Sequence, residues 1–175
     1  MSMLESLRKI VQEANAAKNF SEVLSVIVHQ VKKTMDTDVC SVYLHDPDSN
    51  SYVLMGTDGL NEKAIGKVNM PAEEGLVGLV ASRAEPINLE EASAHPRFSF
   101  YPNTNEQLFH SFLGSPIIHQ RKTLGVLVVQ DKEPRRYDES EESFLVTVAA
   151  QLSGVIAHAD ATGELNRSLH PKAKT

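Results

Sequence analysis

The sequence is poor in the residues that build disulfide frameworks and cysteine-rich metal centres. Cys40 is the one cysteine among 175 residues, and tryptophan is absent. A single cysteine excludes an intramolecular disulfide and any zinc or iron–sulfur site that needs several thiolates. Such scarcity is typical of proteins in a reducing compartment, and we expect a cytoplasmic location.

Positive charge and long apolar runs are scarce as well. Lysine and arginine number 17 against 23 aspartate and glutamate residues, which gives a net charge of −6. That balance argues against nucleic acid and against an anionic membrane as partners. The apolar run 124–129 is far shorter than the roughly 18 residues of a membrane span. Glu5 also interrupts the N-terminus where a signal peptide would be apolar. We therefore expect no nucleic acid and no membrane among the partners.

Two amphipathic helices are predicted at the start of the chain. Apolar residues recur at helical spacing over residues 4–16 and again over residues 20–35. Asn19 and Glu22 have the spacing of a capping box, in which the asparagine caps the helix and Glu22 folds back onto the cap amide.

Extended segments and one small helix follow. In chain order we predict strands at 39–44, 52–55 and 65–70, a helix at 73–83, and extended segments at 86–89, 112–118 and 123–130. Residues 90–110 are irregular, polar and long for a connection, which is typical of a functional loop. In the strand 123–130 we expect Gly125 to allow close packing.

A final helix is predicted over residues 138–160. Asp138 and Glu141 form its capping box, and Gly163 follows its end. The order of elements indicates a single α+β domain over residues 3–160, with a mainly antiparallel central sheet. The N- and C-terminal helices should cover one face, and the small helix and the long loop should cap the other. Residues 161–175 are basic and polar, and we expect a linker or disordered tail.

Catalytic and metal-binding patterns are weak in this sequence. The seven histidines show no metal-ligand spacing. His95 and His110 flank the irregular segment, where a loop-packing role is favoured. Gly75 and Gly78 lack the lysine and hydroxyl residue of a phosphate-binding loop. Stand-alone catalysis therefore ranks last among the hypotheses, and we expect no metal or cofactor in this chain.

Several runs of residues resemble the GAF domain family. Leu124-Gly125-Val126-Leu127 leads through Tyr137-Asp138 into the last helix, as in GAF domains. The longer runs resemble, within that family, the GAF domains of bacterial phosphoenolpyruvate-protein phosphotransferases of the nitrogen-related phosphotransferase system. These runs are residues 35–44, 74–80, 85–89, 112–118 and 137–147. The resemblance covers about residues 3–160.

The resemblance implies a fold and a regulatory role. The fold is GAF-like, related to the PAS and profilin folds. Such a GAF domain precedes a catalytic region that takes a phosphoryl group from phosphoenolpyruvate onto a histidine and passes it to a small phosphocarrier protein. It is expected to sense nitrogen status, with glutamine as the small-molecule signal. On this resemblance the chain is not itself an enzyme, and magnesium belongs to the catalytic region, which this sequence does not include.

Two other activities of GAF proteins fit the residues poorly. GAF enzymes that reduce free methionine sulfoxide look as if they need several cysteines, to attack the sulfoxide and to resolve the product. Cys40 alone cannot complete such a catalytic cycle. Cyclic-nucleotide-binding members carry an Asn-Lys…Phe…Asp-Glu pattern. Gln130 and Tyr137 depart from that pattern here.

GAF ligands sit on the sheet face that residues 71–110 would cover. The predicted ligand-binding residues are Tyr43, Leu76, Val77, Asn88, Arg97, Phe98, Phe100, Tyr101, Phe112 and Ser115. For an amino-acid-like amide, we expect Asn88 and Ser115 to meet the amide and Arg97 to meet the carboxylate. Glu73 or Glu74 would accept from the ammonium. Taken singly, each residue is explained more simply by core or loop packing.

An interaction module is the alternative hypothesis. Apolar residues extend beyond one stripe of the last helix, as at Val146 beside Leu145. The helices at 4–16 and 138–160 are therefore predicted to bundle with those of a second copy, as a homodimer with or without a ligand.

Overall fold

A six-stranded antiparallel sheet forms the centre of the protein in a computed structural model, which describes residues 2–98 and 109–171. The strand order is β3-β2-β1-β6-β5-β4. The elements are α1 (Met3–Ala16), α2 (Phe20–Met35), β1 (Val39–Asp46), β2 (Ser51–Asp58), η1 (Glu62–Ala64), β3 (Asn69–Pro71), α3 (Gly75–Arg83), β4 (Ile87–Leu89), η2 (Ala92–Ala94), β5 (Ser111–His119), β6 (Lys122–Asp131), α4 (Glu139–Thr162) and α5 (Glu164–Leu169).

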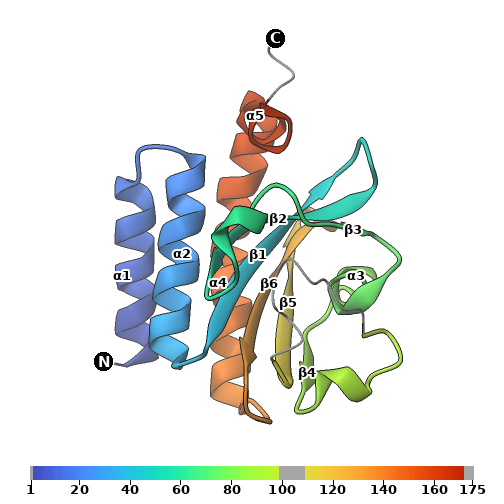
Figure 1. Cartoon of the computed structure of the whole chain (residues 1–175). Helices are drawn as coiled ribbons and strands as arrows, with labels where there is room; N and C mark the ends of the chain where they lie inside the picture. The colour runs from blue at the N-terminus through green and yellow to red at the C-terminus, as the bar shows by residue number, and fades with distance from the viewer. Residues whose placement is uncertain (1, 99–108, 172–175) are drawn as a thin grey trace.

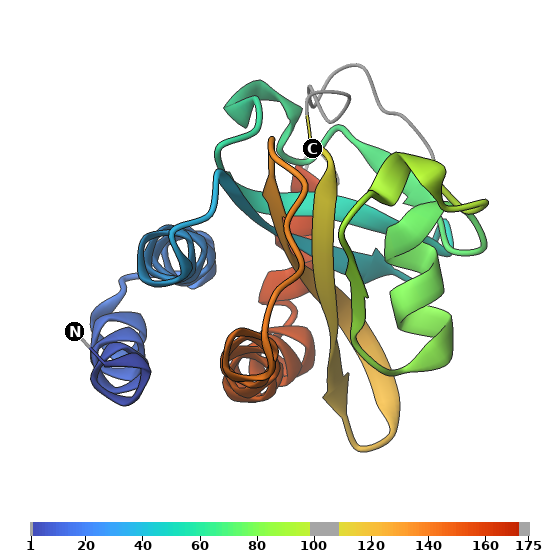
Figure 2. The ribbon, with the colours of Figure 1, turned by 90° about the horizontal axis from the view of Figure 1, so that it is seen from below.

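The sheet separates two layers of helices. Figures 1 and 2 show α1, α2 and α4 on one side of the strands and α3 on the other. This arrangement confirms the predicted α+β class, the antiparallel sheet and the placement of the terminal helices. The helix that begins the chain, α1, lies farther from the sheet than α2 does (Figure 2).

Each face of the sheet has its own apolar core. Side chains alternate between the two faces along a strand, so successive residues of β1 enter different cores. Cys40, Val42 and Leu44 pack toward α2 and α4. Val39 and Tyr43 pack toward α3. The central strands are buried on both faces, which explains their nearly continuous apolar sequence.

The capping signals set the helix boundaries with one difference. Asp138 and Glu141 form both hydrogen bonds of a capping box at the start of α4. Asn19 accepts from the Glu22 amide at the start of α2, but the Glu22 carboxylate accepts from the Lys18 amide rather than from Asn19. The reciprocal bond is therefore displaced by one residue.

Two predicted segments differ from the structure. The strand expected at 65–70 is only Asn69–Pro71, because residues 62–64 form η1 and the following turn delays pairing with β2. Residues 164–169, within the expected linker or disordered tail at 161–175, form the ordered helix α5. Gly163 adopts a positive φ of 84°, the chain turns into α5, and Leu165 enters the core beside α4. The partners of α5 come from distant parts of the sequence, which local patterns do not reveal.

By length and composition, α4 is the one helix in the described ranges that is apolar enough to cross a membrane. Its packing gives another reason for that composition. A stripe from Phe144 to Ala159 is buried in the core between the helices and the sheet.

Gly125 gives a direct test of the central packing. A Cβ at this position would lie 2.3 Å from the Tyr43 carbonyl oxygen and 2.9 Å from Leu44 Cδ2. We expect Gly125→Ala to lower the free energy of unfolding by about 1–3 kcal/mol, measured by urea denaturation. Gly154→Ala is the matched control, because a Cβ on this α4 glycine meets nothing within 4 Å. Alanine should stabilise α4 there by roughly 0.5–1 kcal/mol. Equal stability of wild type and Gly125→Ala would contradict the close approach.

Candidate functional site

The sheet face covered by α3 brings together most of the predicted pocket residues that the structure describes. Tyr43, Leu76, Val77 and Phe112 are buried in one cluster, and the half-buried Phe98 packs against it. Phe100 and Tyr101 lie outside the described residues. The aromatic and aliphatic part of the predicted site is therefore assembled on one surface. Apolar lining with few polar groups is usual for a small-molecule site.

Asn88 and Ser115 lie on the opposite face. Asn88 pairs in register with Leu113, and Ser115 pairs with Leu127; both partners belong to the core beneath α4. Cross-strand neighbours in an antiparallel pair project to the same side, so neither polar side chain can reach the α3 face. Their expected role toward a ligand amide on that face is therefore corrected. The face on which a strand residue lies depends on the register of the strand. An error of one residue in the predicted register moves the side chain to the other face.

The Asn88 side chain has a structural role instead. Its Nδ2 donates to the Tyr137 carbonyl at 2.7 Å, and its Oδ1 accepts from the Tyr137 amide at 3.3 Å. The amide therefore holds the edge strand β4 to the segment that enters α4.

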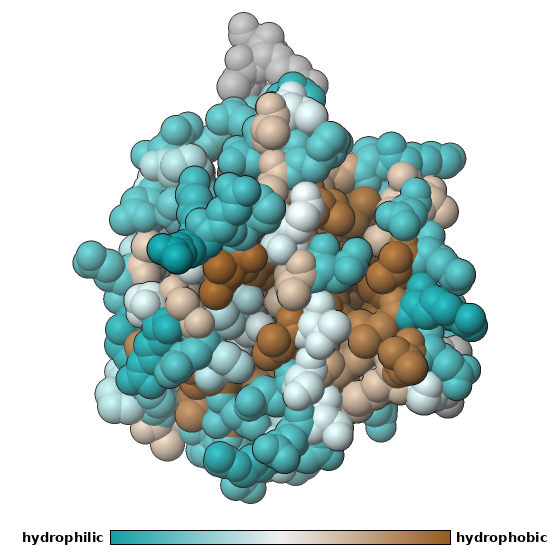
Figure 3. Space-filling model, turned by 180° about the vertical axis from the view of Figure 1, so that it is seen from behind, coloured by the Kyte–Doolittle hydropathy of each residue, from teal (hydrophilic) through white to brown (hydrophobic). Residues whose placement is uncertain are grey.

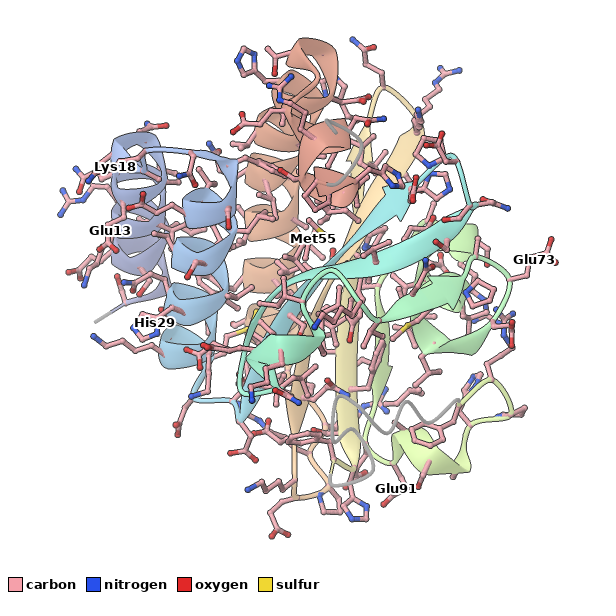
Figure 4. All side chains as sticks on the ribbon, turned by 45° about the horizontal axis from the view of Figure 1, so that its top comes forward. Glu13, Lys18, His29, Met55, Glu73 and Glu91 are labelled. Carbon is pink, nitrogen blue, oxygen red and sulfur yellow. The ribbon has the colours of Figure 1, made fainter. Side chains whose placement is uncertain are left out.

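Arg97 lies beside the start of α3. Its Nη2 donates to the Glu73 carbonyl at 2.8 Å, and its backbone amide donates to His95 Nδ1 at 3.0 Å. The Glu73 side chain is exposed and points away from the protein in Figure 4. Arg97 thus remains near the predicted site, whereas the Glu73 carboxylate does not face it.

His110 takes part in packing around the irregular segment. Its Nδ1 lies at hydrogen-bonding distance, 2.8 Å, from the Glu91 carboxylate. Hydrogen bonds from Ser93 and then His110 lower the pKa of Glu91. Together with the His95 contact, this agrees with the expected loop-packing roles of the two histidines.

Gln130 is a buried polar residue on the α3 face that the sequence argument did not single out. It lies on the α3 face between two apolar cross-strand neighbours, Val39 of β1 and Phe112 of β5. Gln130 is only 4% exposed, and its side-chain oxygen Oε1 has no hydrogen-bond partner. The available signal was a glutamine at the end of an otherwise apolar strand.

Nearby polar side chains on the same face are satisfied. Ser41 and Thr57 share a hydrogen bond of 2.9 Å, and Thr57 Oγ1 also accepts from the Leu60 amide at 3.3 Å. Ser41 pairs in register with Val128, and Val128 lies two residues before Gln130 on the same face of β6. Among the buried side chains of the described residues, Gln130 Oε1 is the one polar atom left without a partner.

A polar network closes the end of β6. Tyr137 donates its hydroxyl proton to Asp131 at 2.7 Å, and Arg135 contacts both Asp131, at 3.0 Å, and Glu141. Burial raises the pKa of the Tyr137 phenol, so the hydroxyl stays protonated and remains a donor. The Arg135 guanidinium also donates to the Met35 carbonyl at 3.1 Å. The network therefore connects the ends of α2 and β6 to the first turn of α4.

Side-chain hydrogen bonds hold α5 against the body of the domain. His170 Nε2 lies 3.1 Å from Asp46 and 3.5 Å from Asp48 in the β1–β2 turn. Glu164 accepts from the Phe20 amide at the start of α2. Asp46, Asp48 and His170 are also the one group of three possible metal ligands within the described ranges. Their mutual contacts fix α5, and we assign them that structural role.

Cys40 lies at the centre of the core between the sheet and the helices. It is fully buried, and burial raises the pKa of its thiol. A protonated, inaccessible thiol is a poor nucleophile, which agrees with its predicted role as a small apolar residue.

A groove of about 450 Å³ lies between α1 and α4. Its apolar lining includes Leu7, Ile10 and Val148, and Leu4 at its margin is 76% exposed. Figure 3 shows hydrophobic surface gathered in hollows on the back of the molecule, the side on which these helices lie. This groove is separated from the α3 face by the sheet.

The fold agrees with that of a known domain family. The model of the GAF domain family matches residues 19–156, and the chain belongs to this family. Its sequence is 48% identical over 160 residues to an Escherichia coli (strain K12) protein described as "Phosphoenolpyruvate-dependent phosphotransferase system". The match covers 91% of this chain and 21% of that protein, so the chain spans about a fifth of its relative.

Solved structures of phosphotransferase GAF domains are similar over nearly their whole length. The GAF domain from an Acinetobacter phosphoenolpyruvate-protein phosphotransferase is 49% identical, with 93% of this chain and 99% of that chain covered and a TM-score of 0.85. The corresponding domain from Coxiella burnetii is 45% identical, with 92% and 96% covered and a TM-score of 0.88. The predicted resemblance to the GAF domains of these phosphotransferases is thereby confirmed.

Tyr137→Phe tests the network at the end of β6. Loss of the hydroxyl removes a donor from the buried Asp131 carboxylate, and we expect the free energy of unfolding to fall by about 1–3 kcal/mol. Tyr52→Phe is the control, because the Tyr52 ring stacks near His45 and its hydroxyl makes no hydrogen bond with the described residues. The control should differ from wild type by less than about 0.5 kcal/mol. Chemical denaturation of both variants measures the difference, and equal effects would contradict a special role for Tyr137.

Proposed function

We propose that this chain is a regulatory GAF domain that binds an amino-acid-like nitrogen metabolite, with glutamine as the expected ligand. The observation that carries the proposal is the likeness to phosphotransferase GAF domains at 49% and 45% identity over almost their full length. The α3 face supports it, because its buried aromatic and aliphatic side chains surround few polar groups.

Regulation would act on phosphotransfer by a longer protein. In that protein, a catalytic region that needs magnesium would move a phosphoryl group from phosphoenolpyruvate to a histidine and then to a phosphocarrier protein. The GAF domain would contribute the sensor and no catalytic group, and we place its action in the cytoplasm.

The helices α4 and α5 offer a route for coupling. The α4 helix packs on the back of the sheet whose front face bears the proposed site. The contact of His170 with Asp46 fixes α5 relative to β1, which contributes Tyr43 to that front face. A ligand that shifts β1 or β6 would therefore alter the direction in which the chain leaves the domain.

A ligand panel tests the sensory role. Isothermal titration calorimetry of the chain with glutamine, 2-oxoglutarate and cyclic nucleotides should show binding of glutamine. Arg97→Gln should weaken that binding about tenfold or more, because the guanidinium is expected to meet the ligand carboxylate. Arg83→Gln at the end of α3 is the control and should bind as wild type does. Absence of heat with every compound would overturn the sensory proposal.

A second candidate function is self-association through the groove between α1 and α4. The strongly exposed Leu4 and the apolar groove favour it, since burial of such surface stabilises an interface. Glu5 and Arg8 both line the groove. In a two-fold contact, each would face the opposite charge of the second copy.

Light scattering tests the proposed homodimer. The wild type should show the mass of a dimer at high concentration, and Leu4→Asp should weaken the dimer about tenfold or more, because a carboxylate would be buried. Ile118→Asp is the matched control, since Ile118 is also exposed, at 37%, but lies on β5 away from the groove. A monomeric wild type at every concentration would rule out this candidate.

A further inference from the structure

We propose that Gln130 is the residue that recognises the ligand, and that the ligand presents a primary amide to it. This inference rests on the proposed function and assigns the ligand class and a specificity-determining residue to the same face of the sheet. No hydrogen bond within the described protein uses the Gln130 carbonyl oxygen, although the residue is 4% exposed.

The position of Gln130 is enclosed by apolar side chains. Its cross-strand neighbours are Val39 and Phe112, and Val128 lies two residues back on the same face. Val39 and Val128 are essentially inaccessible, and Phe112 is 3% exposed. A carbonyl in such surroundings has lost water without gaining a donor, which costs free energy in the ligand-free state.

Other buried polar side chains of the sheet do have hydrogen-bond partners, in contrast to Gln130. Ser41 and Thr57 on the same face pair with each other, and the amide of Asn88 on the other face pairs with Tyr137. Native proteins satisfy nearly all buried polar side chains, so an isolated exception asks for a partner that is not part of the chain.

The chemistry of the side chain defines that partner. The free Oε1 requires a donor, and the adjacent Nε2 supplies two N–H groups. A primary amide matches both in one planar pair, because it offers an N–H to Oε1 and a carbonyl to Nε2. A carboxylate or an oxo group offers only acceptors and would leave Oε1 unpaired.

Gln130 can also take the role toward a ligand amide that the sequence predicts for Asn88 and Ser115. Asn88 and Ser115 face the core beneath α4, whereas Gln130 shares its face with Tyr43 and Phe112. Among the described residues, the α3 side therefore retains Gln130 as a group that matches an amide.

The first experiment compares ligands on the unaltered chain. Calorimetry is performed with glutamine and with the γ-methyl ester of glutamate, which keeps a similar shape but lacks the amide N–H. We expect the ester to bind at least about tenfold more weakly than glutamine. Equal affinity for the two compounds would overturn the role of Gln130, while the sensory function would stand. If neither binds, the proposed function itself fails.

The second experiment substitutes the residue. Gln130→Met removes both polar groups at similar volume, so the ligand-free protein should be as resistant to urea as wild type or more so. Its affinity for glutamine should fall at least about tenfold. Gln30→Met is the control, because Gln30 donates to Glu13 at 3.0 Å on α2, and it should leave affinity unchanged.

The two readouts together distinguish a binding role from a structural one. A stable Gln130→Met protein that binds glutamine as tightly as wild type would overturn the inference and indicate that only a buried water satisfies Oε1. A variant less stable than wild type would also contradict it, since that result means that the amide already has a stabilising partner in the ligand-free protein.

Discussion

The pairing of β1 with β6 at the centre of the sheet is the constraint on which the rest of the structure depends. The two strands pair over six residues, from Val39 opposite Gln130 to Leu44 opposite Gly125. Both strands are covered on both faces, so each must supply apolar side chains to two cores at once. The close approach at Gly125 allows the pair to form without displacing Tyr43. The helices on one side and α3 on the other are then positioned by the side chains that these strands present.

The pairing of β1 with β6 also separates the buried polar side chains that join elements from Gln130, which has no such partner. On the face beneath α4, the polar side chain of Asn88 joins separate elements and is satisfied by backbone groups. The network of Asp131, Arg135 and Tyr137 does the same where β6 leads to α4. On the α3 face, Gln130 is buried without such a partner. If the proposed ligand binds there, it would supply the hydrogen bond that the protein itself does not provide.

The α5 helix adds contacts between separate elements at the end of the described chain. Its contacts, Glu164 to α2 and His170 to the β1–β2 turn, join α5 to elements far away in the sequence. The α4 helix alone would leave the domain in a direction set only by its own core stripe. The added contacts tie the position of α5 to that of β1 and α2.

The sequence by itself determined the class of fold, the order of the elements and the family. Local signals were sufficient for these features, because capping residues such as Asp138 and the apolar period of α4 act within one or two turns of chain. It also indicated the burial of Tyr43, Leu76 and Phe112, which lie in segments of apolar composition and share one cluster; their role as ligand-binding residues stays a prediction. Only the tertiary structure decided which polar residues face the site. Strand parity placed Asn88 and Ser115 beneath α4 and Gln130 beside Phe112, and α5 packs against α4 with further contacts to α2 and the β1–β2 turn. A side chain in a strand changes face with a shift of one residue, and this register is set by pairing between segments far apart in the sequence.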